Sequence, residues 1–373
     1  MVLSSAWLPM TVLHVALSVL AVFLLVVTLL PWFKHPAWWV RIWDFPRLQL
    51  ALLSLAGSVA TAASALAGHW EWGLQLVFLV TLLYQSWWIL PYTPLFKREV
   101  MNAAPGTQDP QLRIMACNVL MPNRNAPGLI DLVRQHQPDV WVTLETDTWW
   151  QQQLQPLEAD YPYRIACPLD NLYGMHVYSR LPLSDTHIRY LVEDEVPSMH
   201  ASVHVNKDLV VRMHFLHPAP PSPTENEAST ERDVELLMVA QSLKNHTGPV
   251  IVTGDLNDVA WSPTTRMFRK ISRLLDPRVG RGMFNSFHAQ YPFARWPLDH
   301  FFHSDHFQVV HIARLPSIGS DHFPVLLELQ YHPANAALQE GLEVDAEEQA
   351  ETRQKLKEEG ASARDVPAPT SRG

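Results

Sequence analysis

Polar residues that can bind metal ions or move protons recur beside short apolar runs after about residue 112. They are carboxylates, carboxamides and imidazoles, and the runs before them, such as PVIVT before GDLND, have the composition of β-strands. The candidates are Asn118, Glu145, His217, Asp255, Asn257, Asp299, Asp321 and His322. A catalytic role for them requires that they converge on one pocket.

This set of residue types suits the hydrolysis of phosphate esters. Mg²⁺ takes hard oxygen ligands, usually one or two carboxylates with water and substrate phosphate, and Glu145 and Asp321 are suitable carboxylates. An Asn side chain can orient water or phosphate oxygens without adding charge. A His with a carboxylate partner can act as a general base or stabilise charge. Much of the catalysis of phosphoryl attack then depends on positioning and electrostatics.

The order of these motifs resembles that of the endonuclease/exonuclease/phosphatase superfamily, which includes deoxyribonucleases, abasic-site endonucleases and neutral sphingomyelinases. GDLN is followed further along by SDHFPV, and N-V at 118–119, L-E at 144–145 and G-x-x-V-Y-S-R at 174–180 lie in the expected order. The resemblance covers residues 112–331. It implies an α/β four-layer sandwich of two mixed β-sheets flanked by helices, with the active site at one end.

The resemblance also implies a role for each matching residue. Glu145 would be the principal ligand of Mg²⁺ or Mn²⁺, supported by Asn118 and Asp321. Asp255 would align or activate the attacking water, and Asn257 would contact the phosphate.

Two histidines complete the implied site. His322, oriented by Asp299, would contact the phosphate or act as a base, and His217 would stabilise the pentacovalent phosphorane or the leaving group. The sequence departs from the pattern at Leu120, where many nucleases of the family carry an acidic residue, and in the Pro-rich segment 218–223. These departures put in doubt a second metal ligand from the first strand and the identity of the substrate.

Basic and aromatic residues follow the GDLND motif. The basic ones are Arg266, Arg269, Lys270, Arg273, Arg278 and Arg281. They could contact nucleic acid or anionic lipid headgroups, or form a solvated helix face. Arg266 and Trp261 are candidate substrate contacts, although a tryptophan here could equally belong to the core. His300 and His303 would point to opposite faces of a strand, which argues against a shared metal ion.

Three long apolar runs precede the catalytic candidates, at residues 11–30, 48–68 and 73–91. Each has about the 20 residues that a helix needs to cross a bilayer, and Trp and Tyr cluster at their ends, so we expect three transmembrane helices. The alternative of buried core helices is less compatible with three such runs. Gly57 and neighbouring small residues in the second run favour close helix packing.

The charged residues beside these runs predict the orientation of the chain. Basic residues lie between the first two runs and after the third, on the same side of a three-helix anchor. They are Lys34, Arg41, Arg47, Lys97 and Arg98. The positive-inside rule then predicts a multi-pass protein of the inner (plasma) membrane with a cytoplasmic catalytic domain.

Composition completes the predicted organisation. We expect a membrane anchor at 1–92, a linker at 93–111, the catalytic domain at 112–331 and an acidic, disordered tail at 332–373, with a short helix near Ala346–Glu359. The net charge of −9 offers no general basic surface for nucleic acid. The two cysteines form no disulfide framework or zinc signature.

The sequence therefore predicts a membrane-anchored, Mg²⁺- or Mn²⁺-dependent phosphoesterase. Its partners would be a lipid bilayer and a phosphate ester, either nucleic acid or a phospholipid or small phosphoester, and no protein partner can be inferred. Nuclease and lipid-headgroup hydrolase are close rivals. The alternative is a catalytically inactive membrane-bound binding module of the same fold, although the retention of the polar residues argues against it.

Overall fold

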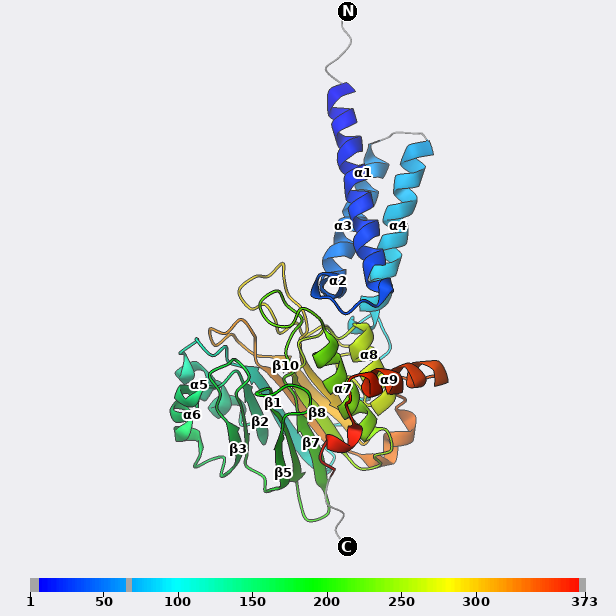
Figure 1. Cartoon of the computed structure of the whole chain (residues 1–373). Helices are drawn as coiled ribbons and strands as arrows, with labels where there is room; N and C mark the ends of the chain where they lie inside the picture. The colour runs from blue at the N-terminus through cyan, green and yellow to red at the C-terminus, as the bar shows by residue number, and fades with distance from the viewer. Residues whose placement is uncertain (1–6, 65–68, 369–373) are drawn as a thin grey trace, which may run out of the picture. The chain divides into compact units, whose positions relative to one another are not determined.

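The computed structural model describes residues 7–64 and 69–368, which form two compact units that divide between Pro91 and Tyr92 (Figure 1). Within its described residues, the first unit is helical. Its elements are α1 (Trp7–Leu29), η1 (Leu30–Phe33), α2 (Trp38–Arg41), η2 (Ile42–Asp44), α3 (Arg47–Ala63) and α4 (His69–Ile89), with the short helix η3 (Leu90–Tyr92) at the division.

The three long helices of the first unit pack through small and polar residues. A Cβ atom on Gly57 of α3 would lie 2.4 Å from a ring carbon of Phe78 on α4, so only glycine permits this approach. The Gln85 amide of α4 donates a hydrogen bond of 2.9 Å to the Thr28 hydroxyl of α1. The prediction that Gly57 allows close helix packing is confirmed.

Only two of the three predicted transmembrane helices are both long enough and apolar enough to cross a membrane. Two apolar helical segments, Thr11–Phe33 and His69–Tyr92, are long enough to cross a membrane. The helix at Arg47–Ala63 has 17 residues, fewer than the roughly 20 that a span needs. The predicted span 48–68 also runs into residues 65–68, which lie outside the described residues. Three transmembrane helices are therefore not confirmed.

The second unit is built on two mixed β-sheets. The first sheet has six strands in the order β10-β11-β1-β2-β4-β3, and the second has five in the order β5-β6-β7-β8-β9. The strands are β1 (Gln111–Asn118), β2 (Val140–Leu144), β3 (Tyr163–Cys167), β4 (Met175–Ser179), β5 (Leu183–Arg189), β6 (Ser198–His204), β7 (Val210–Phe215), β8 (Val250–Asp255), β9 (Asp299–His303), β10 (Phe307–Arg314) and β11 (Val325–Tyr331). Parallel pairing occurs between β1 and β2 and between β7 and β8.

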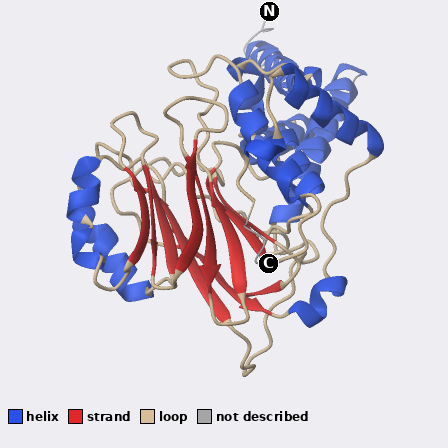
Figure 2. Cartoon of the chain, turned by 60° about the horizontal axis from the view of Figure 1, so that its bottom comes forward, coloured by secondary structure: helices blue, strands red, loops and turns tan. Residues whose placement is uncertain are grey.

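Apolar residues alternate along these strands because one face of each sheet meets the other sheet and the opposite face meets helices. Ile114 of β1 and Val211 of β7 belong to the core between the sheets. Met115 and Met238 belong to the clusters beneath the outer helices. Figure 2 shows helices on the outer sides of the strands. The helices are α5 (Ala126–His136), α6 (Thr148–Gln153), η4 (Gln155–Leu157), α7 (Thr230–Leu243) and α8 (Pro263–Ser272). The predicted pair of mixed sheets flanked by helices is confirmed.

Segment 93–111, predicted as a linker, packs on the second unit. The Ala103 N–H donates to the Val309 carbonyl at 2.9 Å, and the Val309 N–H donates to the Met101 carbonyl at 2.9 Å. Glu99 forms a buried ion pair with Arg269 of α8. These contacts hold the start of the catalytic unit against its sheets.

The tail is folded where it is described, which differs from the prediction of disorder but agrees with the short helix predicted near Ala346–Glu359. Within described residues 332–368 it forms η5 (Pro333–Leu338), α9 (Ala346–Glu358) and η6 (Ala363–Asp365). Leu356 and Val366 are buried in the cluster that contains α7, and Figure 1 shows α9 beside that helix. Composition suggested disorder because acidic residues dominate. The few apolar residues are nevertheless spaced to cover α7, and Asp345 and Glu348 form a capping box at the start of α9.

Candidate active site

The polar residues at the strand ends meet where the two sheets come together. Asn118 ends β1 and Asp255 ends β8 of the other sheet, while Glu145 directly follows β2. The Asn118 amide donates hydrogen bonds of 2.7 Å to Glu145 Oε1 and 3.1 Å to Asp255 Oδ2. Its Oδ1 atom accepts from the Leu120 N–H at 3.0 Å. Asn118 therefore joins two carboxylates from different sheets.

These contacts fix the orientation of the Asn118 amide, because only its NH₂ group can donate to carboxylates and only its oxygen can accept from an N–H. The oxygen is thus directed to the backbone of Leu120. In this arrangement the NH₂ group of Asn118 holds Glu145 in place, and the ligand role that the resemblance implies for Asn118 stays a prediction.

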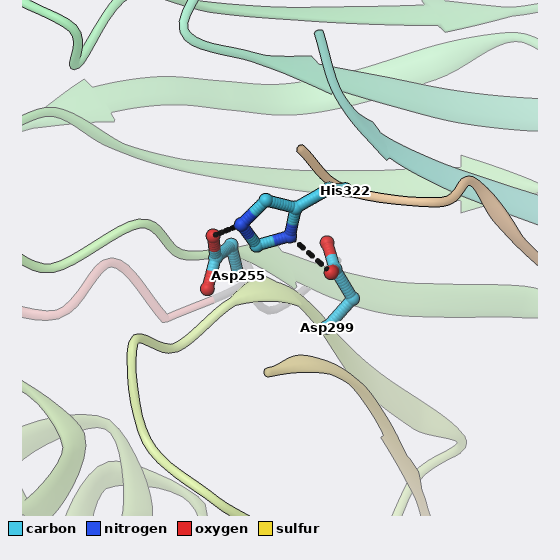
Figure 3. A group of neighbouring side chains, drawn as sticks. All are labelled: Asp255, Asp299 and His322. Atoms are coloured by element: carbon cyan, nitrogen blue, oxygen red, sulfur yellow. Dashed lines mark hydrogen bonds and ion pairs between the residues drawn. The ribbon is translucent and has the colours of Figure 1, made fainter. Parts of the chain in front are cut away.

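His322 lies between two buried carboxylates (Figure 3). Its Nδ1 atom is 2.7 Å from Asp299 Oδ2, and its Nε2 atom is 3.4 Å from Asp255 Oδ2. Asp255 and Asp299 are themselves paired residues of the antiparallel strands β8 and β9. The register of this strand pair therefore places one carboxylate on each side of the imidazole.

The surroundings of Asp255, Asp299 and His322, called the triad below, shift the pKa values of these residues in different directions. Burial alone would lower the pKa of His322, but Asp255 and Asp299 raise it to about 10. Burial raises the pKa of Asp255 to about 7, although His322 opposes the rise. Burial acts in the same way on Asp299, yet the charge and hydrogen bond of His322 bring its pKa below the ordinary value. His322 is thus an imidazolium near neutral pH, and Asp255 can exchange a proton in that range.

Glu145 is a second carboxylate with a raised pKa. Burial raises its pKa to about 7, while the hydrogen bond from Asn118 opposes the shift and the negative charge of Asp321 adds to it. The Met121 N–H donates weakly to Glu145 Oε2 at 3.4 Å. Glu145 has φ +60°, an uncommon backbone conformation for a residue other than glycine. A turn in the chain directly after β2 thus places the carboxylate in the site.

His217 faces the triad from the end of β7. It is buried, and its Nε2 atom lies 4.0 Å from Asp255 Oδ2. Burial, with a smaller effect from His322, lowers the pKa of His217 to about 3, so its ring is neutral. Its Nδ1 atom has no hydrogen-bond partner. A neutral ring with a free polar atom is suited to donate a hydrogen bond to a phosphoryl oxygen or a leaving group.

Two groups of acidic residues could hold a divalent cation. Asp255, Asp299 and His322 have ligand atoms that all lie within 4.8 Å of one another. The His322 imidazolium, however, has no lone pair to offer and already faces a carboxylate at each nitrogen. Glu145 and Asp321 fit a cation better, because the negative charge of Asp321 raises the pKa of the half-buried Glu145 carboxylate, and Mg²⁺ or Mn²⁺ would offset this repulsion.

Of the other residues predicted to contact substrate, some lie at the site and others in the core. Asn257 follows Asp255 with φ +50° and donates its side-chain amide to the Pro218 carbonyl at 3.0 Å. Trp261 is 1% exposed and packs edge-on against Tyr92, so it lies in the core, which is the alternative considered for it beside a substrate contact. Arg266 is a partly buried residue of α8.

The basic run that follows GDLND does not form a solvated cationic face. Arg269 is buried against Glu99, Lys270 pairs with Glu348, and Arg278 is buried against Asp276. The acidic partners lie in segment 93–111, in α9 and beside the run itself. The sequence shows Asp276 within the run, but Glu99 and Glu348 are distant in the chain and could not be identified as partners from local sequence.

His300 and His303 have separate environments, as their strand spacing predicts. His300 Nε2 lies 2.8 Å from the Asp258 carbonyl, whereas His303 Nδ1 lies 2.9 Å from the Ser304 carbonyl. Both are buried residues of β9. They therefore support the strand and the GDLND loop.

Several residues that complete the site were not predicted. The Ser320 hydroxyl donates to the Asn118 carbonyl at 2.8 Å and accepts from the His322 N–H at 3.0 Å. Ser286 accepts from the Asp299 N–H at 3.0 Å. The Tyr173 ring lies 5.4 Å from the His217 ring. Ser320 belongs to the SDHFPV motif and could have been singled out, whereas Ser286 and Tyr173 carry no local signal.

The fold and the site define the class of protein: an α/β sandwich whose strand ends bring carboxylates, an amide and imidazoles together. The sequence model of the Endonuclease/Exonuclease/phosphatase family matches residues 115–322, more than half of the chain, and the chain belongs to this family. Its members are phosphoesterase hydrolases that are generally metal-dependent and act on phosphoester substrates. No curated protein matches the chain by sequence.

Solved structures that are similar to this chain include proteins of D. rerio and Bacteroides thetaiotaomicron. TDP2 of D. rerio, complexed with a single-strand DNA product, is 16% identical with a TM-score of 0.49, covering 59% of this chain and 99% of that one. A family protein of Bacteroides thetaiotaomicron is 19% identical with a TM-score of 0.49, covering 60% and 99%. The mannosyl-6-phosphatase of the same organism is 20% identical with a TM-score of 0.47, covering 59% and 100%.

Proposed function

We propose that the protein is a membrane-anchored phosphoesterase that depends on Mg²⁺ or Mn²⁺ and hydrolyses the phosphate ester of a lipid headgroup. The observation that carries the proposal is the hydrogen-bonded chain from Glu145 through Asn118 to Asp255, which faces His322 at 3.4 Å. It joins the proposed cation-binding carboxylate to a residue that can accept a proton.

Each residue then has a defined task. Glu145 and Asp321 would hold the cation, which when bound supplies positive charge to a phosphoryl oxygen. Asp255, with a pKa of about 7, would orient the attacking water and accept its proton. The His322 imidazolium, held by Asp299, would stabilise the negative charge of the phosphoryl group. We assign His217 to the leaving-group side of the site.

Asn257 is proposed as a further phosphate contact. One of its two N–H groups is given to Pro218, and the other remains available to an oxygen of the substrate. It is partly exposed and lies two residues after Asp255. We do not assign such a contact to Trp261, because its ring is buried.

The choice of a lipid ester over nucleic acid follows from the charges and from the helical unit. Arginines that could have formed a positively charged surface for nucleic acid form ion pairs within the protein, as Arg269 and Arg278 do. Large apolar side chains are exposed along α1, α3 and α4, for example Val15 at 59%, Leu52 at 57% and Leu83 at 69%. Such a surface favours an apolar environment, and a bilayer would keep the covalently linked catalytic unit near lipid headgroups.

The activity is tested with the full chain in detergent and bis-p-nitrophenyl phosphate as substrate. We expect turnover with Mg²⁺ or Mn²⁺, none with EDTA, and a loss of at least about 100-fold in Glu145→Gln. Glu347→Gln, which alters an exposed glutamate of α9, is the matched control and should retain wild-type turnover. Absence of metal-dependent turnover would favour the catalytically inactive module, and full turnover in Glu145→Gln would overturn the role proposed for Glu145.

The substrate class is tested separately. Phospholipid vesicles and plasmid DNA are supplied to the same preparation with the activating cation. Release of a phosphorylated or dephosphorylated headgroup without DNA cleavage supports the lipid proposal. The reverse result would establish a nuclease and overturn it.

The proposed orientation places the catalytic unit in the cytoplasm, with the protein in the inner membrane. The basic residues that support this placement flank the helices, among them Lys34 and Arg98. Fusion of alkaline phosphatase to the C-terminus should give an inactive reporter. An active reporter would place the catalytic unit on the opposite side.

A further inference from the structure

A cavity of about 410 Å³ lies in the second unit, on the outer face of the second sheet and away from the triad residues. Strand β7, the C-terminal end of α7 and residues 363–368 of the tail form its walls. The polar side chains that line it are Arg189, Arg212, His214, Ser242, His246 and Arg364. None of the residues assigned to the active site contributes to this lining.

Two buried polar atoms in this lining have no hydrogen-bond partner. They are Nε of Arg212, a residue 3% exposed, and Nε2 of His214, which is 2% exposed. Leaving a buried polar group without a hydrogen-bond partner is unfavourable, and more so for a charged group. Since both residues line the same cavity, a single acceptor could satisfy them together.

The other atoms of these side chains are fixed by the fold. Arg212 Nη1 donates to the Asp185 carbonyl at 3.2 Å, and Nη2 donates to the Pro367 carbonyl of the tail at 2.8 Å. His214 Nδ1 lies 2.7 Å from His200 Nδ1. In the tautomer in which His214 accepts that bond, its Nε2 atom carries a hydrogen and is a donor. The donors are therefore held in place before a ligand arrives.

The charge of the cavity is predominantly positive. Three arginines line it, and the only acid among the described lining residues is the exposed Asp365. Burial lowers the pKa of Arg212 to about 10, with Asp185 opposing the shift, so the guanidinium remains charged at neutral pH. A buried guanidinium with few acidic neighbours favours the binding of an anionic ligand.

We propose that this cavity is a second anion site, which binds a phosphate-type oxyanion, either inorganic phosphate or the phosphate group of a small phosphoester. Arg212 Nε and His214 Nε2 are the buried donors, and Arg189 and Arg364 supply charge at the opening. The C-terminal segment closes the site through Pro367. This inference is independent of the proposed catalytic function.

The site is tested by calorimetric titration of the full chain in detergent with inorganic phosphate. EDTA is present, so that cation-dependent binding at the catalytic site is suppressed. We expect saturable binding that is weakened about tenfold or more in Arg189→Ala/Arg364→Ala, because both charges lie at the opening. Arg353→Ala, at an exposed position of α9, is the matched control and should bind as the wild type does.

Two further variants keep the test decisive. Arg212→Lys retains the charge but removes Nε, and it should also bind phosphate more weakly while its melting temperature shows that it is folded. Glu145→Gln should bind normally. Absence of saturable binding to the wild type, or unchanged binding in the Arg189→Ala/Arg364→Ala variant, would overturn the proposal, as would a loss of binding confined to Glu145→Gln. Competition by glycerol phosphate would identify a phosphoester ligand, and its failure would identify free phosphate.

Discussion

At the scale of single residues, the site separates groups that would otherwise behave alike. Asp255 and Asp299 both flank His322, but Asp299 makes the shorter contact, 2.7 Å against 3.4 Å. The pKa of Asp299 is lowered while that of Asp255 is raised to about 7. One carboxylate therefore holds the imidazolium, and the other is available for proton transfer.

Asp299→Asn tests this division, since Asp299 is a positioning residue. Loss of the charge should leave His322 less strongly held as an imidazolium, and we expect kcat to fall by about 100-fold. The cation concentration that gives half-maximal activity should be unchanged, because Glu145 and Asp321 are intact. Both quantities are measured by steady-state hydrolysis of bis-p-nitrophenyl phosphate.

Asp131→Asn on the exposed face of α5 is the control for this experiment and should behave as the wild type. A kcat equal to that of the wild type in Asp299→Asn would contradict the assigned role. A changed cation requirement with unchanged kcat would instead assign Asp299 to the cation site.

His176 provides a test of stability against pH. It is fully buried on β4, and burial lowers its pKa from 6.5 to about 4, while Asp147 opposes the shift. Below pH 6.5 the unfolded chain takes up a proton that the folded chain cannot, so stability is lost as the pH falls towards 4. Between pH 7 and pH 5 the wild type should lose about 2 kcal/mol more than His176→Leu in urea unfolding. Equal losses would refute the assignment.

At the scale of elements, the site depends on close approaches at the strand ends. Gly254, the residue before Asp255, has φ +142°, and a Cβ atom there would lie 2.0 Å from the Leu216 carbonyl oxygen. Gly174 is similarly close to the Thr146 carbonyl, at 1.9 Å. These glycines let the chain bring Asp255 beside His217 and Glu145 beside the start of β4.

Gly254→Ala should therefore be strongly destabilising, because the clash is with backbone that cannot move without breaking the pairing of β7 and β8. We expect a loss of about 2–4 kcal/mol in the free energy of unfolding, measured by urea denaturation. Gly248→Ala is the control, since its Cβ atom would meet only the far end of the His246 side chain at 3.1 Å. A loss below about 0.5 kcal/mol in Gly254→Ala would contradict the prediction.

At the scale of the whole molecule, the chain consists of two units with different surfaces. The first exposes large apolar side chains on its helices, whereas the second, from Tyr92 onward, has its own cores between and outside two sheets. Segment 93–111 and the tail contribute ion pairs and apolar contacts to the second unit. The second unit is therefore larger at both ends than the catalytic domain 112–331 predicted from motifs.

A chain of residues 92–373 should fold without the helical unit, because its cores are internal to it. We expect a cooperative thermal transition by circular dichroism and elution as a soluble species by size exclusion. A chain of residues 112–331 should be less stable, since it lacks Glu99 as the partner of Arg269 and lacks Leu356. Aggregation of the longer chain, or equal stability of the two, would contradict this prediction.

The comparison of sequence with structure shows where local reasoning was sufficient. The motif residues were identified from their types and order because each strand end carries its own signal, as in GDLND and SDHFPV. The sequence left open whether Trp261 and the basic run contact substrate, and it predicted a disordered tail that is folded where the structure describes it. In each case the contacting group is distant in the sequence: Tyr92 contacts Trp261, α7 packs against the tail, and Glu99 pairs with Arg269.

The sequence by itself determined which chemical groups are present. The order of these groups along the chain also indicated the family. Only the tertiary structure decided that Asn118 donates to Asp255, a residue 137 positions away, and that two carboxylates share His322. The physical reason is that composition specifies the charge that each side chain can carry. The packing of two sheets, with the loss of water between them, decides which of those charges must compensate one another.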